Sequence, residues 1–495
     1  MKKLLSYLQT IIATDGNVVA IAVAISGVLV ASHWQYTTDD TYIYAQFAKN
    51  LLAGHGMAFN AGEQTYGFTS PLWLFLMAGM RLCGFDLIMG SKILGMAFTL
   101  AATAIMLPVA KICLKKRETA IALAFAWAAN AWELRWAACG LETPMVVFLV
   151  LTAILIYYTE KNAGRFRYTG IILGVAALAR PELALLLPLV LIDVLANIPH
   201  KSISLFFRII LPAACIVLPW WALAEYSFHS IIPNTALAKA GFDFSLRACV
   251  ASATKIGAII CATNVLEAAL CLGFLCMLLR NSWNMRLFFL ISWVVFLPLL
   301  FIATDAEVHS RYLLAIIPVI MIIGWSVFEK IAVVQRRYKK WLLIFTVFVI
   351  AQNQYVLWNI INPHTRIFMQ AMENTLIPIA QWIKENTPAD AEIAAPDIGV
   401  LAYISDRKIL DLFGLTTPAM RKFSDSSMHA KVRYRLFLSA GKPDYVIDGH
   451  SSQQDSLLVY ATPPQYSLVK NWKVPILNIE GNGDETYYTI YKLQY

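Results

Sequence analysis

The charged residues best able to do chemistry lie beside long apolar blocks. Ionisable side chains are costly next to hydrocarbon, so each one raises a functional hypothesis. A carboxylate in such a place can take a proton from a hydroxyl group, and a cation can pair with a phosphate. A membrane enzyme needs both groups to bind a lipid phosphate and activate a hydroxyl. The residues concerned are Asp39, Asp40, Glu63, Glu133, Arg135, Glu142, Arg180, Glu182, His229, Lys239, Asp305, Glu307, His309 and Arg311.

The pair Asp39-Asp40 follows the first apolar block and precedes an amphipathic stretch, Tyr42–Leu52. The structural alternative is that Thr38, Asp39 or Asp40 caps this helix and interacts with its dipole. Both interpretations can hold at once, because two neighbouring carboxylates can divide the roles of base and positioner.

Four further segments carry such residues, and each has its own structural alternative. These alternatives are a carboxylate that begins a helix, an ion pair at a helical hairpin, a turn with a snorkelling lysine, and an interfacial salt-bridge cluster. No single segment decides the matter, whereas five such segments on one membrane face favour a functional site. In that order the residues are Glu142; Arg180 and Glu182; Asn234 and Lys239; and Asp305, Glu307, His309 and Arg311.

The elements that must position these residues are membrane-spanning helices. The chain has 495 residues, of which 59% are hydrophobic and 14% charged, against about 25% charged in soluble domains. Its apolar blocks are long enough to cross about 30 Å of hydrocarbon at about 1.5 Å per residue. The clearest blocks are Asn17–Trp34, Leu87–Ala110, Pro144–Tyr158, Ile209–Leu223, Leu287–Ala303, Tyr312–Val327 and Trp341–Trp358.

The charge of the loops predicts the orientation of the spans. The net charge is +9, but the excess Lys and Arg lie in short loops, which is the positive-inside pattern and excludes nucleic acid as the partner. The N-terminal block is predicted to be a retained anchor. If Phe68–Leu82 is juxtamembrane or re-entrant, about eleven spans result, and Asp39, Asp40 and the C-terminal end all face outward. The predicted cytoplasmic loops are Lys111–Glu118, Glu160–Arg167, Asn197–Arg208, Arg280–Arg286 and Glu329–Lys340.

The composition changes near Asn362, which predicts a transmembrane domain over residues 1–361 and a soluble extracytoplasmic α/β domain over 362–495. A helical pattern over Ile367–Asn386 precedes short β-like runs that alternate with helical stretches. Neither a Walker loop nor a zinc-spaced cluster is present, and the eight cysteines are interpreted as small core residues. The predicted strands are Glu392–Ala395, Lys408–Leu412, Asp444–Asp448 and Thr486–Lys492, with helices near Gly399–Ile404 and Ala430–Ser439.

With these motifs the sequence resembles the GT-C class of membrane glycosyltransferases, and within it the terminal β-(1→2) arabinofuranosyltransferases. The most specific segment is DDTYIYAQFAKNLLAGHGMAFNAGEQTYGFTSPLW, Asp39–Trp73, although its turn reads Gly67–Pro71 where the family has a YT-like turn. Weaker similarities follow in the same order along the chain. They are GLETP at Gly140–Pro144, LARPE at Leu178–Glu182, IPNTALAK at Ile232–Lys239, SRYLLAIIP at Ser310–Pro318 and the segment Pro396–Leu415.

The resemblance implies an inverting transfer of a sugar, such as arabinofuranose, from a polyprenyl-phosphate donor. Asp39 or Asp40 would be the base. The implied acceptor is an extracytoplasmic glycan, lipid or protein such as a pilin, at the inner membrane of a bacterium. A divalent cation near the aspartates is compatible with this chemistry but not predicted to be required. Implied donor and phosphate ligands are Arg180, Lys239, Arg311, His309 and Asn234, and substrate-positioning residues are Glu142, Glu182, Tyr66, Thr69 and Asp305.

Two other functions remain as alternatives. A transporter or flippase of lipid-linked sugars would place charges near the bilayer midplane and often shows paired halves, whereas these charges gather at one face and no repeat is evident. A pure binding protein would not need about eleven spans.

Overall fold

The computed structural model describes residues 2–197, 203–239, 241, 244–278, 287–333, 337–424, 426–450, 464–474 and 486–495. The chain divides into two compact units. The first, called here the helical unit, comprises Met1–Trp34, Lys92–Trp221 and Ala240–Ile361. The second, called the mixed unit, comprises Gln35–Ser91, Ala222–Lys239 and Asn362–Tyr495.

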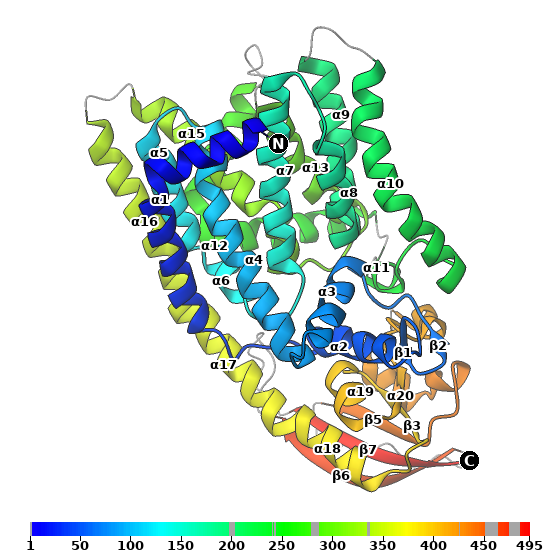
Figure 1. The fold of residues 1–495 in the computed structure, drawn as a ribbon. Coiled ribbons are helices and arrows are strands. Elements are labelled where there is room, and N and C mark those ends of the chain that lie inside the picture. The colour runs from blue at the N-terminus through cyan, green and yellow to red at the C-terminus, as the bar shows by residue number, and fades with distance from the viewer. Residues whose placement is uncertain are drawn as a thin grey trace. The chain divides into compact units, whose positions relative to one another are not determined.

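The helical unit is built from long apolar helices joined by short connections (Figure 1). Two of its helices, α4 and α10, continue across the unit boundary. The helices are α1 (Lys2–Ala31), α4 (Leu87–Cys113), α5 (Arg117–Ala128), α6 (Ala131–Trp136), α7 (Thr143–Ala163), α8 (Thr169–Ala179), η1 (Pro181–Leu185), α9 (Leu186–Asn197), α10 (Ile203–Phe228), α12 (Leu246–Leu278), α13 (Phe288–Ala303), α14 (Ser310–Leu313), α15 (Ile317–Val333), α16 (Tyr338–Val356) and η3 (Leu357–Ile361).

Six helices in the described part of the chain are long and apolar enough to cross a membrane. They include α1, α4, α7, α10, α12 and the continuous helix that begins with α16. The sequence prediction of a mostly helical, polytopic membrane protein is thereby confirmed, whereas the count of about eleven spans stays a prediction. The predicted loop Arg280–Arg286 lies outside the described residues, as do 198–202 and 334–336 of two other predicted loops.

The apolar segment predicted not to cross forms a short helix, α3 (Pro71–Leu82). It begins at Ser70, whose hydroxyl accepts a hydrogen bond from the backbone N–H of Trp73. Its 12 residues extend about 18 Å, well short of about 30 Å of hydrocarbon. That α3 lies beside the membrane or re-enters it stays a prediction.

Buried carboxylates fix the basic connections of the helical unit. Asp15, at a kink in α1, pairs with Lys111 of α4 and Arg117 of α5. Glu329 of α15 accepts the backbone N–H of Lys115. A basic loop that is neutralised in this way has a fixed position without leaving buried charge unpaired.

The mixed unit combines a first group of elements that follow α1 with the C-terminal part of the chain (Figure 1). The sequence predicts the C-terminal part alone as a domain, whereas the compact unit also includes Gln35–Ser91 and Ala222–Lys239. Besides α3 and five strands, its elements are α2 (Asp39–Leu52), β1 (Ala58–Asn60), β2 (Glu63–Gln64), α11 (Asn234–Lys239), α17 (Asn362–Ala371), η4 (Met372–Leu376), α18 (Ile377–Asn386), α19 (Gly399–Ser405), η5 (Pro418–Phe423), α20 (Met428–Arg433) and η6 (Leu436–Ser439).

A five-stranded mixed sheet organises the C-terminal part, with strand order β4-β3-β5-β7-β6. β3 (Glu392–Ala395) runs parallel to both β4 (Lys408–Asp411) and β5 (Tyr445–His450). β7 (Thr486–Gln494) runs antiparallel to β5 and to β6 (Gln465–Val474). The carboxyl ends of the three parallel strands therefore lie at one edge of the sheet. After β3, the next strand β4 lies on one side of it and β5 on the other, so the order of strand addition reverses at β3.

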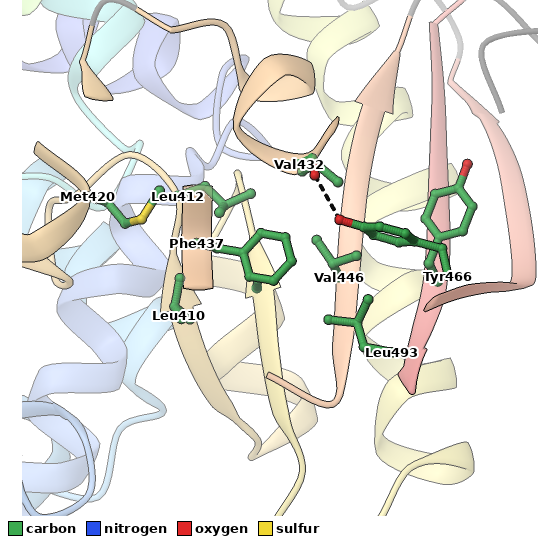
Figure 2. Close-up of a cluster of buried hydrophobic side chains, with 10 residues drawn as sticks. Leu410, Leu412, Met420, Val432, Phe437, Val446, Tyr466 and Leu493 are labelled. Carbon is green, nitrogen blue, oxygen red and sulfur yellow. Dashed lines mark hydrogen bonds between the residues drawn. The ribbon is translucent and has the colours of Figure 1, made fainter. Parts of the chain in front are cut away.

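The core of this part packs α20, η5 and η6 on one face of the sheet (Figure 2). Phe437 is fully buried and lies among Leu410, Leu412 and Val446. The hydroxyl of Tyr466 donates to the carbonyl of Val432 at 2.8 Å, so even the polar atom at its rim has a partner. The cluster consists of Ala394, Leu410, Leu412, Met420, Val432, Phe437, Val446, Tyr466, Tyr491 and Leu493.

The four strands predicted here are confirmed, within two residues at either end. The helix over Ile367–Asn386 is present as α17, η4 and α18, and those near Gly399 and Ala430 are α19 and α20 with η6. The edge strand β6 is not predicted from the sequence. Its residue Leu468 is 61% exposed, and Lys470 interrupts the apolar pattern.

Replacement of Phe437 by Ala should lower the free energy of unfolding of the C-terminal part by about 3–5 kcal/mol, because the substitution leaves a cavity in the core. Thermal unfolding of the purified protein, followed by tryptophan fluorescence, measures this. Tyr434→Ala is the matched control, since Tyr434 is 66% exposed and its loss should cost less than about 0.5 kcal/mol. Equal losses in the two variants would contradict the assignment of the core.

Candidate functional site

Asp39, the first residue of α2, binds the C-terminal part of the chain. Its carboxylate accepts the backbone N–H of Gly399 at 2.9 Å and of Val400 at 2.8 Å, at the start of α19. A Cβ atom at Gly399 would collide with the backbone and both carboxylate oxygens of Asp39, so this approach requires glycine. The expected cap of α2 is not made by its N-cap residue Thr38, whose side chain forms no capping hydrogen bond.

Further contacts hold the same pair of segments together. The side chain of Asn60 both accepts from the N–H and donates to the carbonyl of Ile409, so it continues the hydrogen bonding of the edge strand β4. Lys408 pairs with Glu63 at 2.6 Å, and Lys49 of α2 pairs with Asp406 at the end of α19. The segment Asp39–Gln64 is therefore attached to α19 at its first residue and to strand β4 near its last.

A second carboxylate from the C-terminal part lies close to Asp39. Asp397 follows β3 and accepts a hydrogen bond from the hydroxyl of Tyr488, which lies on β7. Burial and the charge of Asp397 raise the pKa of Asp39 above its usual range, against the lowering effect of the Val400 and Gly399 N–H groups. Burial also raises the pKa of Asp397, where the hydrogen bond from Tyr488 lowers it and the charge of Asp40 raises it. Asp39, Asp40 and Asp397 thus form one electrostatically linked centre.

A cluster of aromatic residues lies in the mixed unit where α10 ends and α11 begins. Tyr66 is buried and stacks on Phe228 with ring centroids 4.8 Å apart, while Phe68 meets both rings edge-on. The carbonyl of Tyr66 accepts the N–H of Asn234 at 2.8 Å, which fixes the start of α11. Tyr66 and Asn234, predicted for separate roles, are thus neighbours, and Lys239 lies at the end of the same short helix.

Thr69 lies in the turn before α3, within 3.4 Å of the hydroxyl of Tyr44. The same hydroxyl accepts the N–H of Ser70 at 3.0 Å, so Tyr44 of α2 orders the turn. This turn is the place where the sequence departs from the arabinofuranosyltransferase pattern, and it is held by α2 itself.

Arg180 is the centre of a buried ion-pair cluster in the helical unit. Its guanidinium donates to Glu142 at 2.7 Å and to Glu182 at 2.5 Å, and it lies 4.5 Å from the ring centroid of Tyr312. The local pair with Glu182, considered as a structural alternative, is therefore present, together with a longer-range pair. Within the described residues, one carboxylate oxygen of Glu142 is buried and accepts no hydrogen bond.

Arg311 also lies over the ring of Tyr312, 5.0 Å from its centroid, and 5.8 Å from that of Trp136. It donates to the hydroxyl of Tyr312 at 3.2 Å, and the indole N–H of Trp136 donates to Ser310 at 2.9 Å. Arg180 and Arg311 are 8% and 9% exposed, so their charges are largely removed from water. Two arginines that share one aromatic ring form a compact cationic group, partly neutralised by the two glutamates.

The structure places His309 beside the same Tyr312, with ring centroids 5.7 Å apart. The imidazole of His309 lies 3.5 Å from Glu307, and both side chains are about half exposed. Asp305 has a positive φ of 45° and accepts from Ser252 of α12 at 3.1 Å. The salt-bridge alternative thus describes the His309–Glu307 pair, whereas Arg311 turns toward Tyr312 and Trp136.

Sequence reasoning missed several residues of these clusters. Lys92 is 6% exposed inside an apolar block and lies over the ring of Trp34, and a lone lysine in such a block is a signal that could have found it. Tyr488, Asp397 and Tyr312 had no comparable signal. In the described part of the chain, no group of three or more His, Cys, Asp or Glu residues is arranged to hold a metal ion.

Comparison with known proteins gives a family for part of the chain only. Residues 363–491 match a family described as a domain of unknown function (DUF8728). No match was found among curated proteins.

Solved structures resemble the whole chain. The structure of ArnT from Cupriavidus metallidurans bound to undecaprenyl phosphate has a TM-score of 0.56 at 12% identity and covers 97% of this chain and 98% of its own. The apo oligosaccharyltransferase of Archaeoglobus fulgidus has a TM-score of 0.54 at 14% identity, over 87% of this chain and 69% of its own. The same archaeal enzyme, AglB, in complex with an inhibitory peptide and a dolichol-phosphate gives 0.56 at 11% identity, over the same shares. At these identities the likeness concerns the fold, and it confirms the predicted GT-C type of helical bundle with a C-terminal sheet.

Replacement of Gly399 by Ala should loosen α19 from Asp39, because the added methyl group cannot fit beside the carboxylate. We expect faster hydrogen exchange of the amides of residues 399–405 and a stability loss of about 1–3 kcal/mol. Hydrogen exchange with mass spectrometry on the full chain measures both.

Gly257→Ala is the matched control, because nothing lies within 4 Å of its added Cβ in helix α12. It should be neutral or stabilising by about 0.5–1 kcal/mol. If Gly399→Ala behaves as this control does, the contact between Asp39 and α19 is not as described.

Proposed function

We propose that the chain is an inverting glycosyltransferase that moves a sugar from a polyprenyl-phosphate donor to an acceptor hydroxyl. The observation that carries the proposal is the pair Asp39-Asp40, in which the first carboxylate is bound by backbone N–H groups and the second follows directly on helix α2. Catalysis would take place at the extracytoplasmic face of a bacterial inner membrane, the orientation that the loop charges predict.

The fold supports a lipid-linked donor. Two of the similar structures contain a polyprenyl phosphate, namely ArnT with undecaprenyl phosphate and AglB with a dolichol-phosphate. Six described helices of this chain are long and apolar enough to cross a bilayer, in which the lipid tail of such a donor would lie.

We assign the role of base to Asp40 and a positioning role to Asp39. Both oxygens of Asp39 already accept backbone hydrogen bonds from α19, so its carboxylate is directed at the protein backbone and not at an acceptor hydroxyl. Successive helical residues point about 100° apart, since a turn has about 3.6 residues. The carboxylate of Asp40 therefore leaves α2 in a different direction from that of Asp39, which is bound to α19.

The proposed transfer is a single displacement at the anomeric carbon of the donor sugar. The acceptor oxygen attacks the anomeric carbon while its proton passes to the carboxylate of Asp40. The bond between the anomeric carbon and the phosphate oxygen breaks as the new glycosidic bond forms, and the configuration at that carbon inverts. Both electrons of the broken bond leave with the polyprenyl phosphate, whose added negative charge needs cations nearby.

Arg311 and Arg180 are the proposed cations for this leaving phosphate. Guanidinium groups bind phosphate oxygens through two parallel N–H donors, and the exclusion of water strengthens the interaction. Glu142 and Glu182 orient Arg180 through its two ion pairs, and the buried second oxygen of Glu142 is an acceptor suited to a sugar hydroxyl. Lys239, His309 and Asn234 are proposed as further donor ligands, and Tyr66, Thr69 and Asp305 as substrate-positioning residues.

The sugar is proposed to be a pentofuranose such as arabinofuranose, from the resemblance of Asp39–Trp73 to the arabinofuranosyltransferases. The acceptor is proposed to be a glycan, a lipid or a protein such as a pilin.

A divalent cation is the one cofactor that the similar structures raise, because one of them is a complex of the archaeal enzyme with Zn and sulfate. Both oxygens of Asp39 already accept N–H groups, so Asp40 is the carboxylate left to turn an oxygen lone pair toward an ion. A divalent cation is compatible with the proposed step, which does not depend on it.

A flippase of lipid-linked sugars is the second candidate function, favoured by the lipid phosphate in the similar structures. Such a protein would need the arginines but not a base. Loss of activity with Asp40→Asn alone, while polyprenyl phosphate binding is retained, distinguishes the transferase from the flippase.

Asp40→Asn should reduce transfer by about 100- to 10,000-fold, because it removes the general base while preserving shape. Membranes of a deletion strain supply both the donor and the unmodified acceptor, so the sugar need not be known. Purified variants are added to these membranes, and the restored product is measured by mass spectrometry. Asp390→Asn, an exposed carboxylate of the mixed unit, should remain fully active, and a fully active Asp40→Asn would refute the assignment.

Arg311→Gln should weaken the binding of undecaprenyl phosphate by about 10- to 100-fold, the value of a charged hydrogen bond of about 1.5–3 kcal/mol. Binding is measured by the thermal shift of the protein in nanodiscs with added undecaprenyl phosphate. Arg366→Gln, an exposed arginine of α17, is the matched control and should bind as the wild type does. Unchanged binding by Arg311→Gln would remove this residue from the donor site.

A further inference from the structure

Asp397 and Tyr488, for which the sequence predicts no role, belong to the C-terminal part that binds Asp39. Asp397 follows the carboxyl end of β3, and Tyr488 lies on β7 with its hydroxyl donating to Asp397. Asp397 occupies the point where β4 and β5 flank β3 on opposite sides. In open α/β sheets this switch point is where ligands bind.

A continuous chain of contacts connects these residues to Asp40. Tyr488 fixes Asp397 through a hydrogen bond. Two residues further on, the N–H groups of Gly399 and Val400 fix the carboxylate of Asp39, and Asp40 is the next residue of α2. The C-terminal part is therefore connected to the proposed base through two hydrogen-bonded contacts, which the backbone of 397–400 joins to one another.

A purely structural connection would not need two carboxylates. Asp39 and Asp397 are near one another, and like charges in a poorly hydrated place cannot both ionise without cost. The ionisation of one group therefore depends on the charge of the other, as in coupled carboxylates.

We propose that Asp397 and Tyr488 are positioning residues of the transferase, which complete a three-carboxylate centre and leave Asp40 as its proton acceptor. This inference rests on the proposed function. It assigns to the C-terminal part a direct share in the chemistry, in addition to any binding of the acceptor.

The pH dependence of the rate carries the test, because a merely structural role would lower the rate at every pH without moving the profile. Removal of the Asp397 charge relieves repulsion in the centre, so the acid limb of the profile should move to lower pH by about one unit. Tyr488→Phe favours the protonated form of Asp397 and should move the limb in the same direction by less. Among the neighbouring ionisable groups, burial and the charges of Asp39 and Asp86 raise the pKa of Tyr42. Burial and Asp86 raise the pKa of Tyr403, on which Arg81 and Tyr42 also act.

The experiment compares Asp397→Asn and Tyr488→Phe with two matched controls in the deletion-strain membranes, from pH 5 to 9 by initial rate. Tyr466→Phe removes a buried hydroxyl from the same sheet that donates to a carbonyl, not to a carboxylate. Asp411→Asn removes a buried carboxylate at the end of β4, where it accepts the N–H groups of Phe413 and Thr416. We expect the first two variants to lose about 10- to 100-fold in rate at neutral pH and to shift the acid limb, and the controls to keep the wild-type profile.

Acid limbs that coincide for all four variants would overturn the proposal. Should Asp397→Asn fail to fold, Tyr488→Phe alone decides, since it removes only one oxygen atom. Failure of the proposed function is recognised separately, because Asp40→Asn would then restore the product as fully as the wild type does.

Discussion

The bond between the Asp39 carboxylate and the first N–H groups of α19 is the interaction on which the mixed unit depends. It joins residues about 360 positions apart in the chain, and it needs Gly399 because any side chain would collide with Asp39. Because α2 starts at Asp39, the same bond sets where that helix begins and where Asp40 points. The carboxylate thus acts as a partner for the orphan N–H groups at the start of a helix in another part of the fold.

The helical unit holds two buried arginines, Arg180 and Arg311, and stabilises their charges in a place with little water. Glu142 and Glu182 compensate the charge of Arg180, while Tyr312 and Trp136 surround Arg311 with aromatic rings. Aromatic faces stabilise a guanidinium without neutralising it. A cationic group built in this way keeps its positive charge for a new anion, the role proposed here toward the leaving phosphate.

Much of the architecture could be predicted from local patterns. The apolar blocks became α1, α4, α7 and α16, and β3 was predicted with its observed bounds because Pro396 ends an apolar run. β6 could not be predicted, because Lys470 and Asn471 interrupt the alternation of apolar and polar residues in this edge strand. Arg180 and Glu182 could be predicted as a pair because they flank a proline in sequence. Tyr488 and Asp397 could not, since their role depends on a strand order that returns β7 beside β5, and no local spacing encodes that order.

The central claim is that this membrane protein transfers a sugar from a polyprenyl phosphate. Mass spectrometry of the envelope glycans, lipids and pilin-like proteins of a deletion strain, with the polyprenyl-phosphate sugars of the same cells, tests it most directly. We expect an acceptor that lacks one sugar mass, such as that of a pentose, together with accumulated donor. Acceptors of unchanged mass and an unchanged donor pool would contradict it.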